Sequence, residues 1–156
     1  MAELKFGTVD GKVNEIYTKG AFQASQVLPA KSGRFVTYDV SDASWISCEN
    51  DEATIGGYVE ESLTTSATKG ATSLGIISVR QRVFKLPYAA AGAAATLTAA
   101  VAITLVGKLI DLYVDGNGVQ YADNAASQAI LRVEGHDVDN NALLVSVIDS
   151  AIVQQS

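Results

Sequence analysis

The chain has 156 residues, enough for one domain with a self-sufficient apolar core. Its formal net charge is −6 and its 11 basic residues are scattered, which argues against a nucleic-acid partner, because phosphate recognition needs clustered Lys and Arg. Cys48 is the single cysteine, so an intramolecular disulfide framework and a thiolate metal cluster are excluded.

The first 33 residues carry spaced Gly and Pro breakers among short β-like pieces, with little periodicity. This pattern predicts an extended N-terminal arm or short strands over residues 1–33, followed by a β domain over 34–156, within a single domain overall. The N-terminal residues lack the apolar segment of a secretory signal, so we expect synthesis in a cytoplasm.

From residue 34 the strand pattern is clearer. Alternating polarity predicts a strand over 34–40, and a polar cluster at 41–44 predicts a turn into a second strand at 45–48. Residues 62–70 are rich in Ser and Thr, which indicates an exposed loop. A long β-rich run over 74–86 follows, and we expect Pro87 to end it.

The 22 residues from 86 to 107 contain no charged side chain. Length alone would let them cross a membrane, but nine are alanine, so a segment packed closely against protein, such as a neighbouring subunit, is the favoured interpretation and no membrane partner is expected. Between Leu97 and Leu105 the apolar residues fit one face of a helix and also one face of a strand. A short helix and a strand therefore both remain open.

Residues 107–124 have the pattern of a β-hairpin. Ile110, Leu112 and Val114 alternate with polar residues, and the sequence Asp-Gly-Asn-Gly at 115–118 suits a tight turn before the return strand. A second hairpin is predicted from strands at 130–138 and 142–148, the latter apolar on both faces and hence central or covered.

Short strands separated by frequent turn signals, without alternating βα units, predict a mainly β fold. We expect an antiparallel β-barrel or β-sandwich of short strands, with an extended N-terminal arm and at most one short helix.

Residues with reactive side chains do not form a recognisable catalytic or metal motif. The Asp-rich turns that begin at Asp115 and Asp137 lack the glycine and the bidentate glutamate of a calcium loop, so both are interpreted as turns. His136 is the single histidine and lies on a strand near a turn, and Cys48 is expected to be a buried, inert thiol. We expect no catalytic residue, no cofactor and no metal.

The stretch from Ala89 to Val133 combines a small-residue run, a glycine, a strand, an Asp-Gly turn, a second strand, a small-residue loop and a third strand. In this layout, in its length and in its acidic Gly/Ala/Thr-rich composition, the chain resembles the head decoration (cement) proteins of tailed bacteriophages. The resemblance implies a protein without a catalytic site that binds the outer surface of an assembled capsid, often as a trimer, and bridges subunits of the major capsid protein.

The resulting expectation is a virion structural protein made in the host cytoplasm, with the major capsid protein and further copies of itself as partners. Candidate subunit contacts are Tyr113, Phe6, Ala91 and Ala94. One alternative is a carbohydrate-binding or adhesive β domain that uses Tyr113 and Trp45 as stacking platforms. Another is a hydrolase that works through His136.

Overall fold

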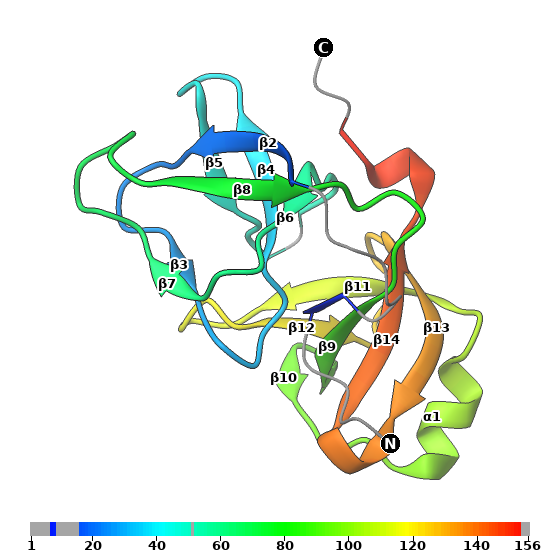
Figure 1. Ribbon diagram of the computed structural model, residues 1–156. Helices are drawn as coiled ribbons and strands as arrows, with labels where there is room; N and C mark the ends of the chain where they lie inside the picture. The colour runs from blue at the N-terminus through cyan, green and yellow to red at the C-terminus, as the bar shows by residue number, and fades with distance from the viewer. Residues whose placement is uncertain (1–6, 9–15, 51, 154–156) are drawn as a thin grey trace.

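The computed structural model describes residues 7–8, 16–50 and 52–153, and within them the fold is mainly β. Five strands close into a barrel in the order β9–β12–β11–β13–β14 and back to β9 (Figure 1). These strands are β9 (Phe84–Ala90), β11 (Leu109–Val114), β12 (Gln120–Asp123), β13 (Leu131–Asp137) and β14 (Ala142–Val147). The predicted mainly β fold is confirmed, and of the two predicted architectures, an antiparallel barrel or a sandwich, the chain forms a barrel, in which β12 and β9 pair in parallel.

A second sheet lies beside the barrel, at the upper left of Figure 1, in the order β2–β8–β6–β4–β5. Its strands are β2 (Ile16–Ala21), β4 (Phe35–Asp39), β5 (Ser44–Ser47), β6 (Gly57–Tyr58) and β8 (Ser73–Ile77). A bridge between Phe22 and Trp45 brings its two outer strands together. A small pair of strands, β3 (Val27–Leu28) and β7 (Leu63–Thr64), lies next to it.

The remaining elements are short and pack on the barrel. Strands β1 (Gly7–Thr8) and β10 (Ala93–Ala94) both pair with β9. The helix α1 (Ala99–Leu105) lies beside β13, and the 3-10 turns are η1 (Val138–Asn140) and η2 (Asp149–Ala151). Of the predicted arm, residues 1–6 and 9–15 lie outside the described residues, while residues 16–33 contribute β2 and β3.

The two sheets share one apolar junction. The ring of Phe84, on barrel strand β9, lies 5.0 Å from the ring of Phe35 and 4.6 Å from the ring of Tyr58, both on strands of the second sheet. All three side chains are fully buried. One apolar core, to which all three side chains belong, therefore continues from the barrel into the second sheet. A separate apolar cluster packs against the second sheet, and its largest members are Phe22 and Trp45.

Several local predictions are confirmed. The hairpin at 107–124 forms β11 and β12, with Leu112 opposite Ala122 and Tyr113 opposite Tyr121. The strand predicted at 142–148 forms β14, which has strand neighbours on both sides, as its two apolar faces indicate. The ambiguous segment forms α1, whose first turn is capped because the Thr98 hydroxyl accepts the N–H of Val101.

The β-rich run at 74–86 differs from its prediction. It is divided into β8 and β9 by a turn in which Gln81 has a φ of 52°, and Pro87 lies inside β9 instead of ending it. The next residue, Tyr88, donates its N–H to Asn141 O on the β14 side. Because N–H groups alternate along a strand, Pro87 lacks a donor only on the opposite side. The predicted loop at 62–70 also contains a short strand, β7.

Tyr58 leads to a testable pH dependence. Burial raises the pKa of its hydroxyl to about 12, above the value of about 10 in an unfolded chain. The folded state therefore holds this proton more tightly, and the associated stability is complete below about pH 10 and is lost as the pH rises towards 12. We expect Tyr58→Phe to lose less stability than the wild type between about pH 10 and pH 12, measured by chemical denaturation. An identical alkaline loss in Tyr58→Phe would contradict the assignment.

Candidate functional site

Three of the four expected contact residues lie close together on the barrel. Ala91 and Ala94 are exposed in the hairpin that joins β9 to β10, and Tyr113 is half-buried on β11. A Cβ placed on Gly92, at the hairpin tip, would lie 3.9 Å from Tyr113 Cε2. The fourth residue, Phe6, lies outside the described residues. The hairpin residues Ala91, Gly92, Ala93 and Ala94, together with Tyr113 and Tyr121, are called the hairpin surface below.

The two tyrosines of this surface form a pair. Tyr113 and Tyr121 are directly opposite on β11 and β12, and their ring centroids are 5.8 Å apart. The Tyr121 hydroxyl donates to Asp115 Oδ2 at 3.3 Å. Burial and the nearby Asp115 carboxylate raise the pKa of Tyr121. The Tyr113 ring thus lies beside the tip of the β9–β10 hairpin, and the Tyr121 hydroxyl is hydrogen-bonded to the turn between β11 and β12.

Side chains of the last residue of β12 and of the residue after it are hydrogen-bonded to the tip of the β9–β10 hairpin. Asp123 Oδ2 accepts the N–H of Gly92 at 2.7 Å, and Asn124 Oδ1 accepts the N–H of Ala91 at 3.1 Å. Asp123 is 3% exposed. Ala91 and Gly92 have φ angles of 50° and 75°, a conformation that these two bonds stabilise. A segment without polar side chains of its own therefore obtains its hydrogen-bond partners from a neighbouring strand.

The chain between the hairpin and α1 is held in the same manner. The Asn141 side chain accepts the N–H of Leu97 and donates to Ala95 O at 2.6 Å. Asn141 has a φ of 53°, in the left-handed region that Asn tolerates better than most residues. Sequence reasoning placed Asp123 and Asn124 at the end of a hairpin and Asn141 in a turn, and it missed these roles. The Asp-Asn pair at the end of β12 was the one local signal for them.

The carboxylates considered for calcium are occupied by internal hydrogen bonds. Asp115 Oδ1 accepts the N–H groups of Asn117 and Val119, so it stabilises its own turn. Asp137 Oδ2 is 2.8 Å from Lys85 Nζ and also accepts from Asn140. Among the described residues, no group of three or more His, Cys, Asp or Glu side chains is placed to hold a metal ion.

Among the residues considered for the two alternative functions, Tyr113 belongs to the hairpin surface, whereas the others lie elsewhere or are inaccessible. His136 is exposed on β13, opposite Leu143. Cys48 is 1% exposed, and burial raises the pKa of its thiol. Trp45 is 3% exposed and packs edge-on against Tyr38, so its ring is not available for stacking on a ligand. Of the aromatic residues proposed for a sugar platform, Tyr113 alone reaches the surface.

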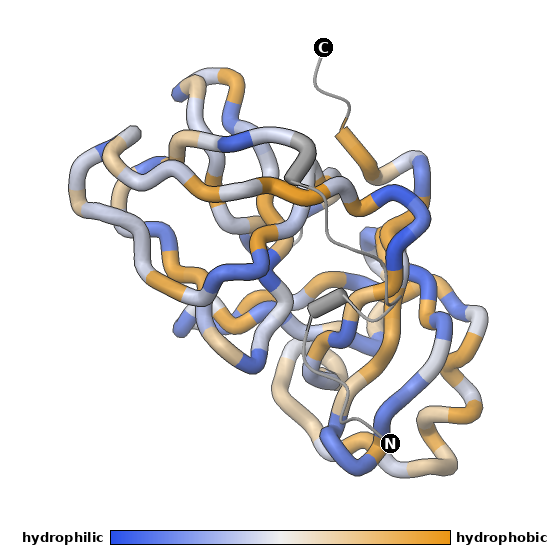
Figure 2. Tube along the Cα trace, in the orientation of Figure 1, coloured by the Kyte–Doolittle hydropathy of each residue, from blue (hydrophilic) through white to orange (hydrophobic). Residues whose placement is uncertain are grey.

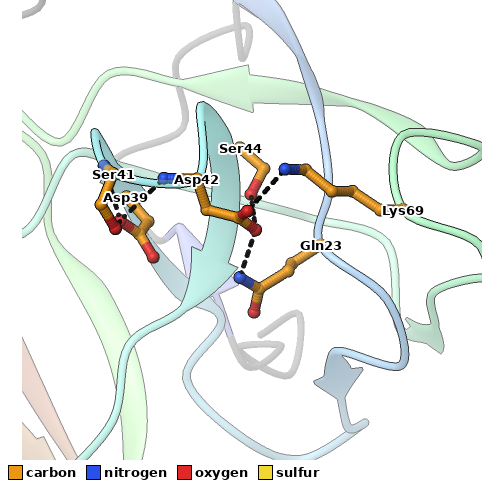
Figure 3. Close-up of polar contacts among 6 residues, drawn as sticks. All are labelled: Gln23, Asp39, Ser41, Asp42, Ser44 and Lys69. Carbon is orange, nitrogen blue, oxygen red and sulfur yellow. Dashed lines mark hydrogen bonds and ion pairs between the residues drawn. The ribbon is translucent and has the colours of Figure 1, made fainter.

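A polar cluster ties together the loops at the far end of the second sheet (Figure 3). The Asp42 carboxylate accepts from Lys69 Nζ and Gln23 Nε2, both at 2.6 Å, and from the Ser44 hydroxyl at 3.2 Å. The hydrogen bond from Lys69 is the main cause that lowers the pKa of Asp42. Because three side-chain donors already surround the Asp42 carboxylate, we interpret the cluster as a structural link between loops.

In the described part of the chain, helices are too short or too polar to cross a lipid bilayer. The uncharged segment at 86–107, for which a membrane span was considered, is divided among β9, β10 and α1. Comparison with protein-family models, with curated proteins and with solved structures finds no match for this chain.

Proposed function

We propose that this chain is a virion structural protein that binds the outer surface of an assembled phage capsid and stabilises it by bridging subunits of the major capsid protein. The observation that carries the proposal is the hairpin surface, whose residues 91–94 are exposed and uncharged and whose tip is hydrogen-bonded to the side chains of Asp123 and Asn124. The resemblance in layout to head decoration proteins supports the same partner.

The physical properties of the hairpin surface suit contact with protein. Its small residues allow a partner backbone to approach closely, and its tyrosines supply apolar area with a polar tip, as interface anchors do. Because the hairpin tip is ordered before binding, association loses little conformational entropy. A protein that binds the assembled shell and not its free subunits stabilises the shell by mass action.

The experiment uses heads of the producing phage that lack this protein, to which purified protein is added before sedimentation. We expect wild-type protein to sediment with the heads and to raise the temperature at which they release DNA. Ala94→Glu, which places a charge on the hairpin surface, should weaken binding at least tenfold. Ala126→Glu, at an exposed alanine outside this surface, is the matched control and should bind like the wild type.

Tyr113 provides a second comparison within the same assay. Tyr113→Ala removes the ring and should weaken binding, whereas Tyr113→Phe keeps the ring and should retain most of it. Failure of the wild-type protein to bind heads, or equal binding by Ala94→Glu and Ala126→Glu, would overturn the proposal.

A carbohydrate-binding function is the second candidate, because the Tyr113 and Tyr121 rings lie side by side next to the carboxylate of Asp115. Aromatic rings beside hydrogen-bonding groups are suited to stacking on sugars. A glycan-array signal that Tyr113→Ala abolishes, in protein that does not bind heads, would favour this candidate over the capsid proposal.

A further inference from the structure

The turn between β11 and β12 contains an asparagine with an unusual neighbour. Of the six asparagines in the sequence, Asn117 is the single one that a glycine follows. Asn117 is exposed, and Figure 2 shows the end of this hairpin in the blue of hydrophilic residues. An Asn-Gly step is chemically labile, because glycine has no Cβ to hinder attack by its backbone nitrogen on the preceding side-chain amide.

The side chain of Asn117 also differs from the others in its contacts. In the part of the chain that the structure describes, the other asparagine side chains take part in hydrogen bonds with the protein; they are Asn50, Asn124, Asn140 and Asn141. Among the same described residues, Asn117 forms a hydrogen bond through its backbone N–H and none through its side-chain amide. The amide carbon of Asn117, Cγ, can therefore rotate towards the backbone nitrogen of Gly118.

Asp115 holds the backbone of this turn closed. Its carbonyl oxygen accepts the N–H of Gly118 at 3.1 Å, and its Oδ1 accepts the N–H groups of Asn117 at 2.9 Å and Val119 at 3.0 Å. Attack on Asn117 Cγ by Gly118 N needs a different arrangement of these two atoms, so the turn has to open first. Exposed turns open locally at a small free-energy cost. Asp115 thus controls how often the reactive arrangement forms.

We propose that Asn117 and Gly118 form a self-modification site, at which the folded protein deamidates in preference to its other asparagines and at a rate that Asp115 restrains. Gly118 N forms a bond to Asn117 Cγ and loses its proton to a solvent base, while the Cγ–Nδ2 bond breaks and the nitrogen leaves as ammonia. Water then adds to either carbonyl of the resulting succinimide and opens the ring, which gives aspartate or isoaspartate. The net change is the uptake of one water and the loss of one ammonia, and it requires no enzyme.

Both products change the turn. Each places a new carboxylate close to that of Asp115, and like charges at short range repel. Isoaspartate also adds one carbon atom to the backbone between β11 and β12, where the register of the hairpin depends on the length of the turn. The turn packs closely against β3, since a Cβ placed on Gly118 would lie 3.3 Å from Val27 Cβ. We therefore expect the modified protein to be less stable than the unmodified one.

Peptide mapping by mass spectrometry tests the site. Purified wild-type protein is kept folded for several weeks in mildly alkaline buffer and is then digested at acidic pH, where the reaction is slow. We expect aspartate and isoaspartate at position 117, whereas Asn124, which alanine follows and whose side chain is hydrogen-bonded, should remain intact. The chain unfolded in guanidinium chloride should convert Asn117 several-fold faster than the folded chain. An intact Asn117 in the folded protein, or equal conversion of Asn124, would overturn the proposal.

The role of Asp115 is tested by Asp115→Ala, which removes the carboxylate bonds within the turn. This variant should convert Asn117 several-fold faster than the wild type. Asp149→Ala, at an exposed aspartate outside the turn, is the matched control and should convert at the wild-type rate. An unchanged rate in Asp115→Ala, or a faster rate only under conditions in which that variant has lost its folded fluorescence, would show that Asp115 does not restrain the reaction. These measurements use purified protein alone, so their result is independent of whether the protein binds phage heads.

Discussion

Replacement of Gln120 by alanine is expected to lower the free energy of unfolding by about 3 kcal/mol, which corresponds to a melting temperature about 10 °C lower. Gln120 lies on barrel strand β12, is fully buried, and connects the barrel to the second sheet. Its Oε1 accepts the N–H of Phe35 at 2.8 Å, and its Nε2 donates to Phe35 O at 2.9 Å.

The physical reason is that the Phe35 N–H would remain buried without its acceptor. Leaving a buried donor unsatisfied costs about 1–3 kcal/mol, and removal of the buried side chain adds a cavity term. The measurement is urea denaturation followed by fluorescence, with Gln128→Ala as the matched control, because Gln128 is exposed. If Gln120→Ala and Gln128→Ala were equally stable, the side-chain bonds between the sheets would be energetically unimportant.

The second large effect is expected at the buried ion pair of the barrel. Lys85 Nζ lies 2.8 Å from Asp137 Oδ2, and the Lys85 side chain is 1% exposed whereas that of Asp137 is 16% exposed. Asp137→Ala removes a carboxylate that compensates a buried ammonium group, so we expect it to lower the free energy of unfolding by about 3 kcal/mol. Asp149→Ala, at an exposed aspartate, should have little effect.

The pH dependence of the same variant gives an independent check. The hydrogen bond from Lys85 is the main cause that lowers the pKa of Asp137 below its ordinary value. The stability that comes from this lowered pKa is complete above about pH 5 and is lost as the pH falls through the folded-state pKa. We therefore expect the stability difference between wild type and Asp137→Ala to shrink as the pH falls from about 5 to about 3. A difference that stays constant over this range would contradict the ion-pair explanation.

Lys85→Met tests whether the pair itself is required. An apolar side chain of similar length removes the buried charge together with the need to compensate it, and such replacements are often neutral. The double variant Lys85→Met, Asp137→Ala should thus be more stable than Asp137→Ala alone. Equal stability of these two variants would indicate that Asp137 acts through Asn140, to which it is also bonded.

Local residue patterns were sufficient to predict the class of the fold and the elements with strong periodicity. Alternation of Ile110, Leu112 and Val114, followed by a glycine-rich turn, was sufficient to place the hairpin of β11 and β12. The chemistry of a tight turn and the two-residue period of a strand are both written in neighbouring residues.

How these elements combine follows from long-range packing and not from local patterns. Long-range packing chose the helical form of α1, for which two periods fitted equally well, and it closed the barrel through the parallel pairing of β9 with β12. It also buried Trp45 and placed Asp123 and Asn124 against the hairpin tip. Each of these outcomes depends on contacts between residues about 20 or more positions apart in sequence, or on packing summed over a whole element. A local pattern shows which face of a segment is apolar, and not which partner will cover it.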